Sequence, residues 1–195
     1  MIRTLLSSLL IFIVLNLSSQ ESKENKSLYS GAMLFFQPGF LTAENNYQEI
    51  NSYSSGIGGI LRLYAGNHFT YGLHGGNNKA VYKSANSENS YISFGYGGAF
   101  VGFTARKDKL RFCSSLGLGL GKIRNLHIEN QTETVLNLAE IYFYRGFSLN
   151  PLISLDYYLT EKIALTTQLM TIIAFYNKND LYFCPTFQIG ILFNR

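Results

Sequence analysis

The chain has 195 residues, enough for one domain with a sizeable core. Only 14% of the residues are charged and 15% are aromatic, with no tryptophan; because soluble domains carry about a quarter charged residues, this composition argues against an ordinary water-exposed surface. The net charge of +4 comes from scattered cations and not from a basic run, which argues against a nucleic-acid-binding protein.

Residues 1–19 predict a secretory signal peptide. A single cation, Arg3, precedes an apolar run over residues 5–17, and two serines follow at the expected cleavage site. The run is shorter than the roughly 20 residues that a membrane-spanning helix needs, so an anchoring helix is the weaker alternative. Residues 20–27 are polar and are expected to form a periplasmic leader, which leaves 28–195 as the folded domain.

Eight segments of that domain alternate apolar residues with small or polar ones, the period of two that is typical of β-strands. The expected strands lie at about 28–39, 53–65, 68–76, 90–105, 110–122, 138–158, 163–175 and 181–193. The third strand can extend toward Tyr82, and the sixth starts at either 138 or 147. Pro38 is expected to take the first strand out of its ladder, and Arg145-Gly146 together with Pro151 predict a bulge in the sixth.

Polar segments connect the expected strands. Three longer loops are expected at 42–51, 77–89 and 123–137, and they alternate with short turns at 66–67, 106–109 and 159–162. A further polar turn at 177–180 leads into the last strand. Because long and short connections alternate, the short turns and both termini are expected at one end of the sheet and the loops at the other.

The hairpin from Ser90 to Lys122 shows the pattern most clearly, since each arm has one face of large apolar side chains and one face of small or polar ones. The large residues are Ile92, Phe94, Tyr96 and Phe100 in the first arm, and Leu110, Phe112, Leu116, Leu118 and Leu120 in the second. Glycine and serine suit a crowded lumen better than bulk water. We therefore expect the large face of each arm to point outward and the small face to point inward.

The same rule turns Phe187, Ile189 and Ile191 of the last strand toward lipid, and turns Gln188 inward together with Gly117 and Gly119 of the hairpin. Tilted strands of about ten residues can cross a bilayer. After the signal, no apolar run is long enough for a membrane helix. The predicted fold class is therefore all-β, an eight-stranded antiparallel up-and-down transmembrane β-barrel.

The chain resembles the OmpA/OmpX-type small outer-membrane β-barrels of Gram-negative bacteria. The resemblance rests on the signal at 1–19, on the turn sequence Tyr157-Tyr158-Leu159-Thr160-Glu161-Lys162-Ile163-Ala164-Leu165, and on the last strand ending Gly190-Ile191-Leu192-Phe193-Asn194-Arg195. It covers essentially the whole mature chain. One departure is that such barrels often finish on the aromatic residue itself, whereas two residues follow Phe193 here.

The resemblance implies a location in the bacterial outer membrane, with both termini in the periplasm and the longer loops outside the cell. It also implies the partners of such a protein, which are outer-membrane lipids, lipopolysaccharide and, during biogenesis, the barrel-assembly machinery. We expect a monomer and no nucleic-acid partner.

The resemblance includes enzymes that acylate or deacylate lipid A with a Ser/His pair, a pair that must lie within hydrogen-bond reach. The candidates are His127 with Glu129 in the third loop, and His74 in the third strand. Ile128-Glu129-Asn130 follows His127, without the His-x-Ser pattern of lipid A deacylases. We therefore expect a solvated loop histidine and no catalytic residue, and no spacing of Cys and His predicts a metal site or a cofactor.

Three charged residues, Arg62, Arg111 and Asp156, fall inside strands near the short-turn end on the predicted lumen face. They can be read as an ion-conducting constriction or as a salt-bridged plug. The plug is favoured because an eight-stranded barrel leaves an interior that side chains fill. Neighbouring strands carry Arg111 and Asp156, so we predict an ion pair between these two residues.

Two cysteines, Cys113 and Cys184, would enter an oxidising compartment, where a disulfide is the default expectation. Both point inward in the predicted pattern. We nevertheless expect no disulfide, because one lies near the short-turn end and the other near the loop end of its strand. The expected separation along the barrel axis, about 10 Å or more, exceeds the roughly 4.4–6.8 Å that a disulfide spans between Cα atoms.

The favoured function is a non-enzymatic outer-membrane barrel with a structural or adhesin-like surface role. The alternatives are a membrane-embedded lipid A deacylase or acyltransferase, and a narrow pore. A third class, a soluble lipocalin-like barrel, would invert the faces and bury Leu116, Leu118 and Leu120.

Overall fold

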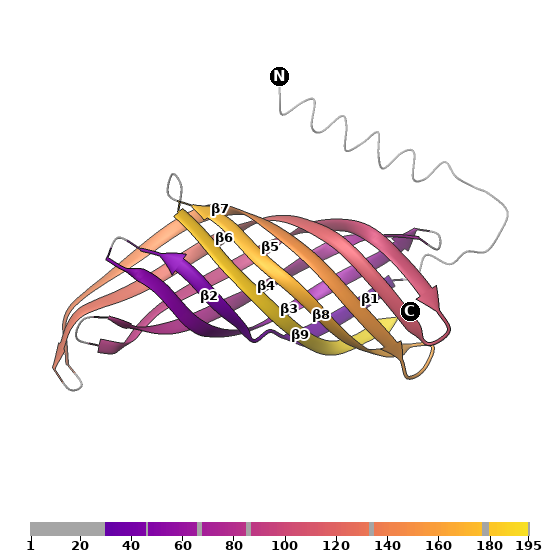
Figure 1. Ribbon diagram of the computed structural model, residues 1–195, viewed down its shortest axis with the longest axis horizontal. Helices are drawn as coiled ribbons and strands as arrows, with labels where there is room; N and C mark the ends of the chain where they lie inside the picture. The colour runs from indigo at the N-terminus through magenta and orange to yellow at the C-terminus, as the bar shows by residue number, and fades with distance from the viewer. Residues whose placement is uncertain are drawn as a thin grey trace, which may run out of the picture.

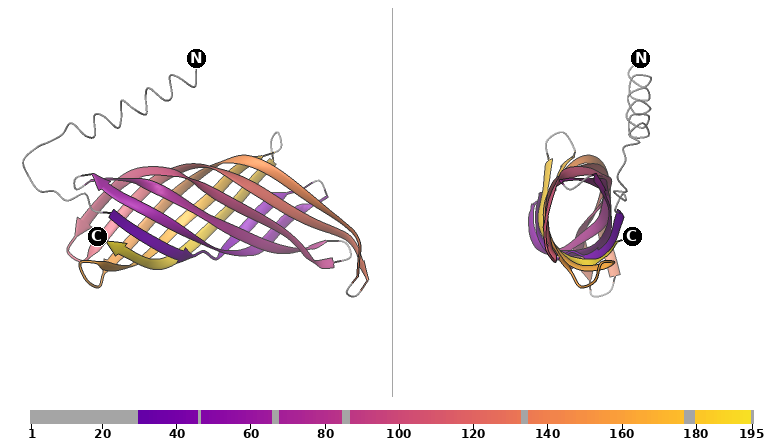
Figure 2. Two further views of the ribbon diagram at one scale, coloured as in Figure 1. Left: turned by 180° about the vertical axis from the view of Figure 1, so that it is seen from behind. Right: turned by 90° about the vertical axis from the view of Figure 1, so that its right-hand side faces the viewer.

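The computed structural model describes residues 30–45, 47–65, 68–84, 87–132, 135–176 and 180–194, so the expected signal peptide and leader lie outside the described residues. The described chain forms antiparallel strands that close into one barrel (Figure 1 and Figure 2), which confirms the all-β prediction. The strands are β1 (Ser30–Phe36), β2 (Gly39–Glu44), β3 (Glu49–Ala65), β4 (Phe69–Ser84), β5 (Ser87–Lys107), β6 (Leu110–Thr132), β7 (Val135–Tyr158), β8 (Ile163–Tyr176) and β9 (Asp180–Asn194).

The barrel has eight strand positions, as predicted, because β1 and β2 are two pieces of one strand. Phe36 pairs with Ile57 and Gly39 pairs with Ser54, so both pieces follow one continuous register along β3. They also follow one register along β9. Pro38 interrupts the ladder without shifting it, and pairing of β3 with β4 completes the ring. A proline removes one donor but inserts no residue, which explains why the register survives.

The start of β1, the end of β9 and the turns at 106–109 and 159–162 lie at one end of the barrel (Figure 1 and Figure 2). The turn expected at 66–67 and residues 177–179 of the turn expected at 177–180 lie outside the described residues. The predicted turn at 106–109 is present between β5 and β6, where Asp108 has a positive φ of 51°. The predicted turn at 159–162 is also present, and the Leu159 amide donates to the Ile163 carbonyl across it. The opposite end, which we call the loop end, carries the other hairpins.

The three predicted loops are wrong, because the strands run through most of their residues. β2 continues to Glu44 and β3 begins at Glu49, while β4 continues to Ser84 and β5 begins at Ser87. β6 and β7 have 23 and 24 residues and form the hairpin that projects furthest (Figure 2). Polar residues are compatible with a β-ladder outside a membrane, since the neighbouring strand still satisfies their backbone groups. The polar segments therefore begin where the apolar outer face of the strands ends, and the strands themselves continue through them.

The predicted bulge in the sixth strand is also wrong. β6 and β7 keep one register from Leu110 opposite Tyr157 up to Ile128 opposite Ala139, and the register shifts only beyond Ile128. Pro151 interrupts the pairing of β7 with β8, but the register on both sides of the break is the same.

The predicted facing is confirmed for the second arm of the hairpin and for the last strand. Leu116, Leu118 and Leu120 are exposed on the outer face, which contradicts a soluble lipocalin-like barrel. Phe187, Ile189 and Ile191 are exposed in the same way, while Gln188, Gly117 and Gly119 point inward.

The facing of the first arm is wrong, since the large residues of β5 point into the lumen. Ile92 and Phe94 are almost fully buried, and Tyr96 and Phe100 are each only 7% exposed. The reason lies in β6, whose glycines leave room in the adjacent lumen: a Cβ atom on Gly121 would clash with the ring of Phe94. Rings from one strand thus fill the space that glycines on its neighbour leave, which a period of two in either strand alone cannot reveal.

Exposed apolar side chains form a belt around the outer face, which we call the apolar belt. On β6 it runs from Leu110 to Leu120, and Phe147 and Val101 belong to it on the neighbouring strands. At a strand rise of about 3.3 Å per residue and a tilt of ~40°, the span on β6 is roughly 25 Å tall, the height of the band in a transmembrane barrel. Within the described residues, no helix is long and apolar enough to span a membrane.

Candidate functional site

The lumen holds a buried ion pair between Arg62 of β3 and Asp156 of β7. Arg62 Nη1 lies 3.0 Å from one carboxylate oxygen of Asp156 and 3.1 Å from the other. Arg62 Nη2 donates to Ser154 and to Gln168, and Thr166 donates to the same carboxylate. We call these residues the lumen cluster: Arg62, Ser154, Asp156, Thr166 and Gln168. All are buried.

The predicted pair of Arg111 with Asp156 is wrong, although their backbones face each other in the β6–β7 ladder. The guanidinium of Arg111 instead lies 4.1 Å from the ring centre of Tyr64 and 5.0 Å from that of Tyr158. The carboxylate of Asp156 is already engaged by Arg62, which reaches across the lumen from a strand that is not adjacent to β7. Arg111 is held by aromatic faces, a favourable position for a guanidinium.

A chain of amide side chains extends the lumen cluster around the barrel interior. Gln168 donates to Gln188, and Gln188 and Tyr96 both donate to the side-chain oxygen of Gln37. Gln37 in turn donates to the Asn77 carbonyl. The network therefore joins opposite walls through hydrogen bonds, and the amide groups of its glutamine side chains are satisfied.

His74 lies inside the barrel between Asn150 and two aromatic rings. Asn150 Nδ2 donates to His74 Nε2 over 2.9 Å and also lies 3.2 Å from Ser148 Oγ. The imidazole packs against the rings of Tyr96 and Phe100. An amide, and not a hydroxyl, therefore contacts this histidine.

The two cysteines are free and lie in different polar groups. Cys113 is 4.0 Å from Arg62 Nη1, next to the lumen cluster. Cys184 contacts Ser54 and Asn78, each at 3.2 Å. The two thiols thus sit at different heights, as the strand positions predict.

His127 lies in a group of side chains at the loop end, and not in a solvated loop as predicted. The ring of Tyr47, from the turn between β2 and β3, stacks on His127 at 4.0 Å with an angle of 6° between the planes. The Tyr47 hydroxyl donates to Glu140 over 2.6 Å and lies 2.7 Å from the Tyr142 hydroxyl. Tyr82 lies 3.1 Å from His127 Nδ1. We call these residues the loop-end cluster: Tyr47, Tyr82, His127, Glu140 and Tyr142.

The electrostatics of the loop-end cluster follow from these contacts. Burial lowers the pKa of His127, while the carboxylates of Glu129 and Glu140 act in the opposite direction. The hydrogen bond to Glu140 raises the pKa of Tyr47. Near neutral pH the cluster therefore holds an uncharged imidazole and a protonated phenol, and it fastens the first hairpin to the projecting β6–β7 hairpin.

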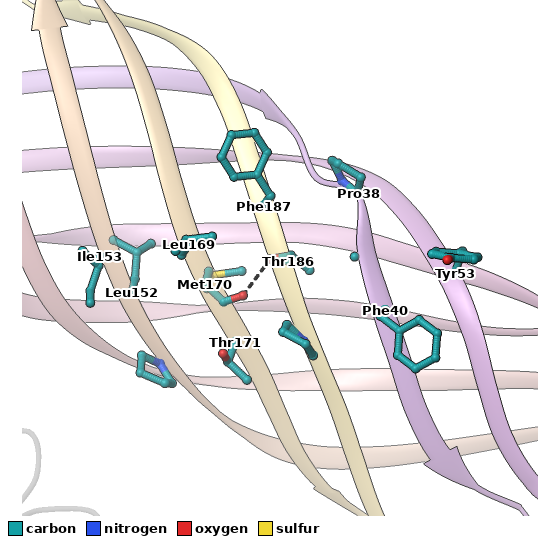
Figure 3. A pocket seen from close by; sticks show the side chains of 13 residues that line it. Pro38, Phe40, Tyr53, Leu152, Ile153, Leu169, Met170, Thr171, Thr186 and Phe187 are labelled. Atoms are coloured by element: carbon teal, nitrogen blue, oxygen red, sulfur yellow. Dashed lines mark hydrogen bonds between the residues drawn. The ribbon is translucent and has the colours of Figure 1, made fainter.

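A groove of about 640 Å³ hollows the outer face where the ladders are interrupted (Figure 3). Its lining includes Pro38, Pro151 and Pro185, which are the three prolines of the chain, so we call it the proline groove. Phe40 and Tyr53 form an edge-to-face pair at one side, with ring centres 5.6 Å apart. Proline lacks the amide that would close a ladder bond, which explains why the wall is interrupted there.

Four cations stand on the outer face of a different part of the wall. Lys79 belongs to β4, Lys122 and Arg124 to β6, and Arg145 to β7, and all four are exposed. We call these residues the basic patch. Periodicity could have placed Lys122, Arg124 and Arg145 outside, but the prediction of loops at 77–89 and 123–137 obscured the patch. No group of three or more His, Cys, Asp or Glu side chains in the described ranges is arranged to hold a metal ion.

Comparisons with solved structures match the fold. The crystal structure of Ail, the attachment invasion locus protein of Yersinia pestis, is 15% identical, with 87% of this chain and 99% of that chain covered and a TM-score of 0.54. Neisserial surface protein A is 10% identical over 83% and 96% of the two chains, with a TM-score of 0.55. A major outer membrane protein from Thermus thermophilus is 10% identical over 85% and 99%, with a TM-score of 0.53.

These structures share the architecture of small outer-membrane β-barrels, which confirms the fold that the resemblance implied. No family model matches the chain, and no curated protein matches it either.

Proposed function

We propose that this protein is a non-enzymatic barrel of the bacterial outer membrane that presents its loop end as an interaction surface. The apolar belt around a filled polar lumen carries this proposal, because large apolar side chains on an outer face are stable only against lipid. The fold likeness to Ail and to Neisserial surface protein A supports the same location. The short turns and both termini would lie in the periplasm and the loop end outside the cell.

The lumen supports a closed barrel and not a narrow pore. Arg62 and Asp156 are fully buried, and the amide chain through Gln168, Gln188 and Gln37 crosses the interior. Breaking a buried ion pair costs several kcal/mol of free energy, about 3–5. The pair and the amide chain would therefore stay in place and block the passage of ions. In planar bilayers we expect no single-channel steps for the purified protein, and repeated steps would support the pore instead.

The projecting β6–β7 hairpin is the proposed interaction surface, and the loop-end cluster holds it in place. Tyr47 joins the hairpin through its ring contact with His127 and its hydrogen bond to Glu140. Tyrosine surfaces of this kind bind partners with little loss of conformational entropy. The two candidate histidines, His74 and His127, are engaged by asparagine and tyrosine side chains, which supports an interaction role over catalysis.

Cysteine labelling in intact cells tests this function and its orientation. A membrane-impermeant maleimide should label Glu140→Cys in intact cells, and it should label Lys109→Cys only after the outer membrane is opened. The wild-type protein is the control, because Cys113 and Cys184 are buried. Labelling of Lys109→Cys alone in intact cells would reverse the orientation, and recovery of the protein in the soluble fraction would overturn the membrane location.

A further inference from the structure

The basic patch is held together by two aromatic rings on the outer wall. Lys79 Nζ lies 4.2 Å from the ring centre of Tyr91, and the guanidinium of Arg124 lies 5.7 Å from the same centre. Lys122 Nζ and Arg124 likewise share the ring of Phe143, at 4.4 and 5.9 Å. Cations that share a ring are therefore no more than about 10 Å apart, close enough for one multiply charged ligand.

Two members of the patch oppose each other directly. Lys122 and Arg145 are partners in the β6–β7 ladder, and both side chains point outward. Like charges directly opposite on one face of a sheet are destabilising. This arrangement costs stability in the isolated barrel, and a bound anion would remove that cost.

The described residues supply no anion for the patch. The ion pairs within those residues are Arg62 with Asp156 in the lumen and Lys83 with Glu88 at the tip of the β4–β5 hairpin. None of the four patch cations is paired with a carboxylate of the described chain. By contrast, the Lys83 ammonium lies 3.2 Å from its partner, so unpaired cations at the loop end are not a general feature of this wall.

On β6 the patch directly follows the apolar belt, while on β7 the exposed side chains of Phe143 and Ile141 lie beyond it. On β6, Leu118 and Leu120 precede Lys122 and Arg124 in the outward positions, and on β7 Phe147 follows Arg145. In a bilayer that covers the belt, this is the level of the lipid head groups on the loop side. Head groups there present phosphates, and the apolar surface just below would contact the chains of the same molecule.

We propose that the basic patch binds the phosphates of an anionic lipid head group, while the adjoining part of the apolar belt contacts its acyl chains. The proposal rests on the proposed function, because the patch meets lipid only if the belt lies in a membrane. Arg donates two hydrogen bonds to one phosphate group, Lys adds a point charge, and the Tyr91 and Phe143 rings keep the charges in place. A soluble phosphate compound shares this chemistry and is distinguished by the test.

Lipid binding to the folded full-length protein in detergent, followed by native mass spectrometry, tests the proposal without requiring a membrane location. The probes are diphosphoryl lipid A, the same lipid without its phosphates, and inorganic pyrophosphate. The test variant carries Lys79→Gln, Lys122→Gln, Arg124→Gln and Arg145→Gln. A matched control removes four other exposed cations, with Lys83→Gln, Lys107→Gln, Lys109→Gln and Lys162→Gln.

The wild type and the control should bind diphosphoryl lipid A with a half-saturation concentration at least about a hundredfold lower than that of the test variant, because each of the four basic side chains near an anionic surface contributes on the order of 1 kcal/mol. The dephosphorylated lipid should bind all three proteins equally and weakly, and salt should weaken only the phosphate-dependent binding. If the four substitutions prevent folding, Lys122→Gln with Arg145→Gln should still weaken binding at least about tenfold.

Equal binding of diphosphoryl lipid A by the test variant and the control would overturn the proposal. Displacement of the lipid by pyrophosphate at equal concentration would make a soluble phosphate compound the ligand and would overturn the lipid assignment. Failure of the proposed function is seen separately, in the cell fractionation and maleimide labelling, because the binding measurement uses purified protein in detergent.

Discussion

The wall made by β4, β5, β6 and β7, which we call the continuous wall, differs from the wall made by β8, β9, β1 and β2, which we call the interrupted wall. In the first, pairing is continuous through the apolar belt, the outer face carries the basic patch, and the strands extend into the projecting hairpin. The second adjoins all three prolines, its pairing is interrupted, and the proline groove hollows its outer face. A barrel can therefore close even when some backbone hydrogen bonds between neighbouring strands are missing on one side.

A side chain adds a hydrogen bond to the uninterrupted β8–β9 ladder at the edge of the groove. The Thr186 hydroxyl donates to the Met170 carbonyl over 2.9 Å, at the edge of the groove (Figure 3). The Phe187 amide still donates to the carbonyl of Pro38, which keeps β9 attached to the interrupted strand. The difference between the walls shows that ring closure preserves register even where single ladder bonds are missing. Four substitutions can break or sharpen this comparison.

The largest effect is expected from Asp156→Ala, which removes the charge that joins β7 to Arg62 across the lumen. Arg62 would stay buried without its ion-pair partner, so the free energy of unfolding should fall by about 3–5 kcal/mol. Equilibrium unfolding in detergent micelles measures this loss. The control is Arg62→Met with Asp156→Leu, which removes both charges and should cost much less. An equal loss in both variants would mean that packing, and not charge, joins β3 to β7.

A charge on the continuous wall should have the next largest effect. Leu118 is half exposed in the apolar belt, so Leu118→Arg should lower the free energy of unfolding by about 2–4 kcal/mol in a bilayer. Ile141 lies beyond the basic patch on β7, and Ile141→Arg should cost ~1 kcal/mol or less. Reversible unfolding in lipid vesicles measures both. Equal costs would place the membrane boundary elsewhere on this wall.

Repair of the interrupted wall should have a smaller, stabilising effect. Pro185 points outward on β9 beside the gap in its pairing with β2, so Pro185→Val can add one backbone donor to that ladder. We expect a gain of about 1 kcal/mol, the net worth of one hydrogen bond. The midpoint of guanidinium unfolding measures the gain, with Val101→Ile on the continuous wall as a nearly neutral control. A loss of stability would show that the groove geometry is itself required by the fold.

The smallest expected effect is the pH response of the hairpin that extends the continuous wall. Burial places the pKa of His127 below its ordinary value of 6.5, so the unfolded cluster binds a proton more readily than the folded one. The contribution of neutral His127 to the stability of the cluster is therefore fully present above about pH 6.5 and is lost as the pH is lowered through that value. The protection factors of the β6–β7 hairpin amides, which correct for the intrinsic pH dependence of hydrogen exchange, should therefore fall below pH 6.5, and His127→Gln should abolish this fall.

Much of the fold follows from local pattern. Leu116, Leu118 and Leu120 alternate with glycines, and Phe187, Ile189 and Ile191 alternate with Gln188 and Gly190, so the contrast between large apolar and small or polar faces predicted their outward facing. The turn at Asp108 and the interruption at Pro38 were predictable too, because charged turn residues and proline act on the backbone where they stand.

The candidate sites depended on residues that are distant in sequence. Arg62 and Asp156 were expected in the lumen, but their direct pairing was missed because β3 and β7 are not neighbours in the sheet. The loop-end cluster was missed because Tyr47 and His127 come from separate hairpins, and nothing in either segment indicates the stacking of their rings.

The sequence by itself determined the strand period, the short turns and the outward faces of β6 and β9, because these depend on each residue and its nearest neighbours along the chain. Only the tertiary structure decided that Phe94 points inward, that Arg62 and not Arg111 pairs with Asp156, and that the strands continue past the apolar belt. Each of these depends on free volume or on a partner supplied by another strand: the empty space over Gly121, the carboxylate reached across the lumen, and the neighbouring strand that accepts the backbone hydrogen bonds.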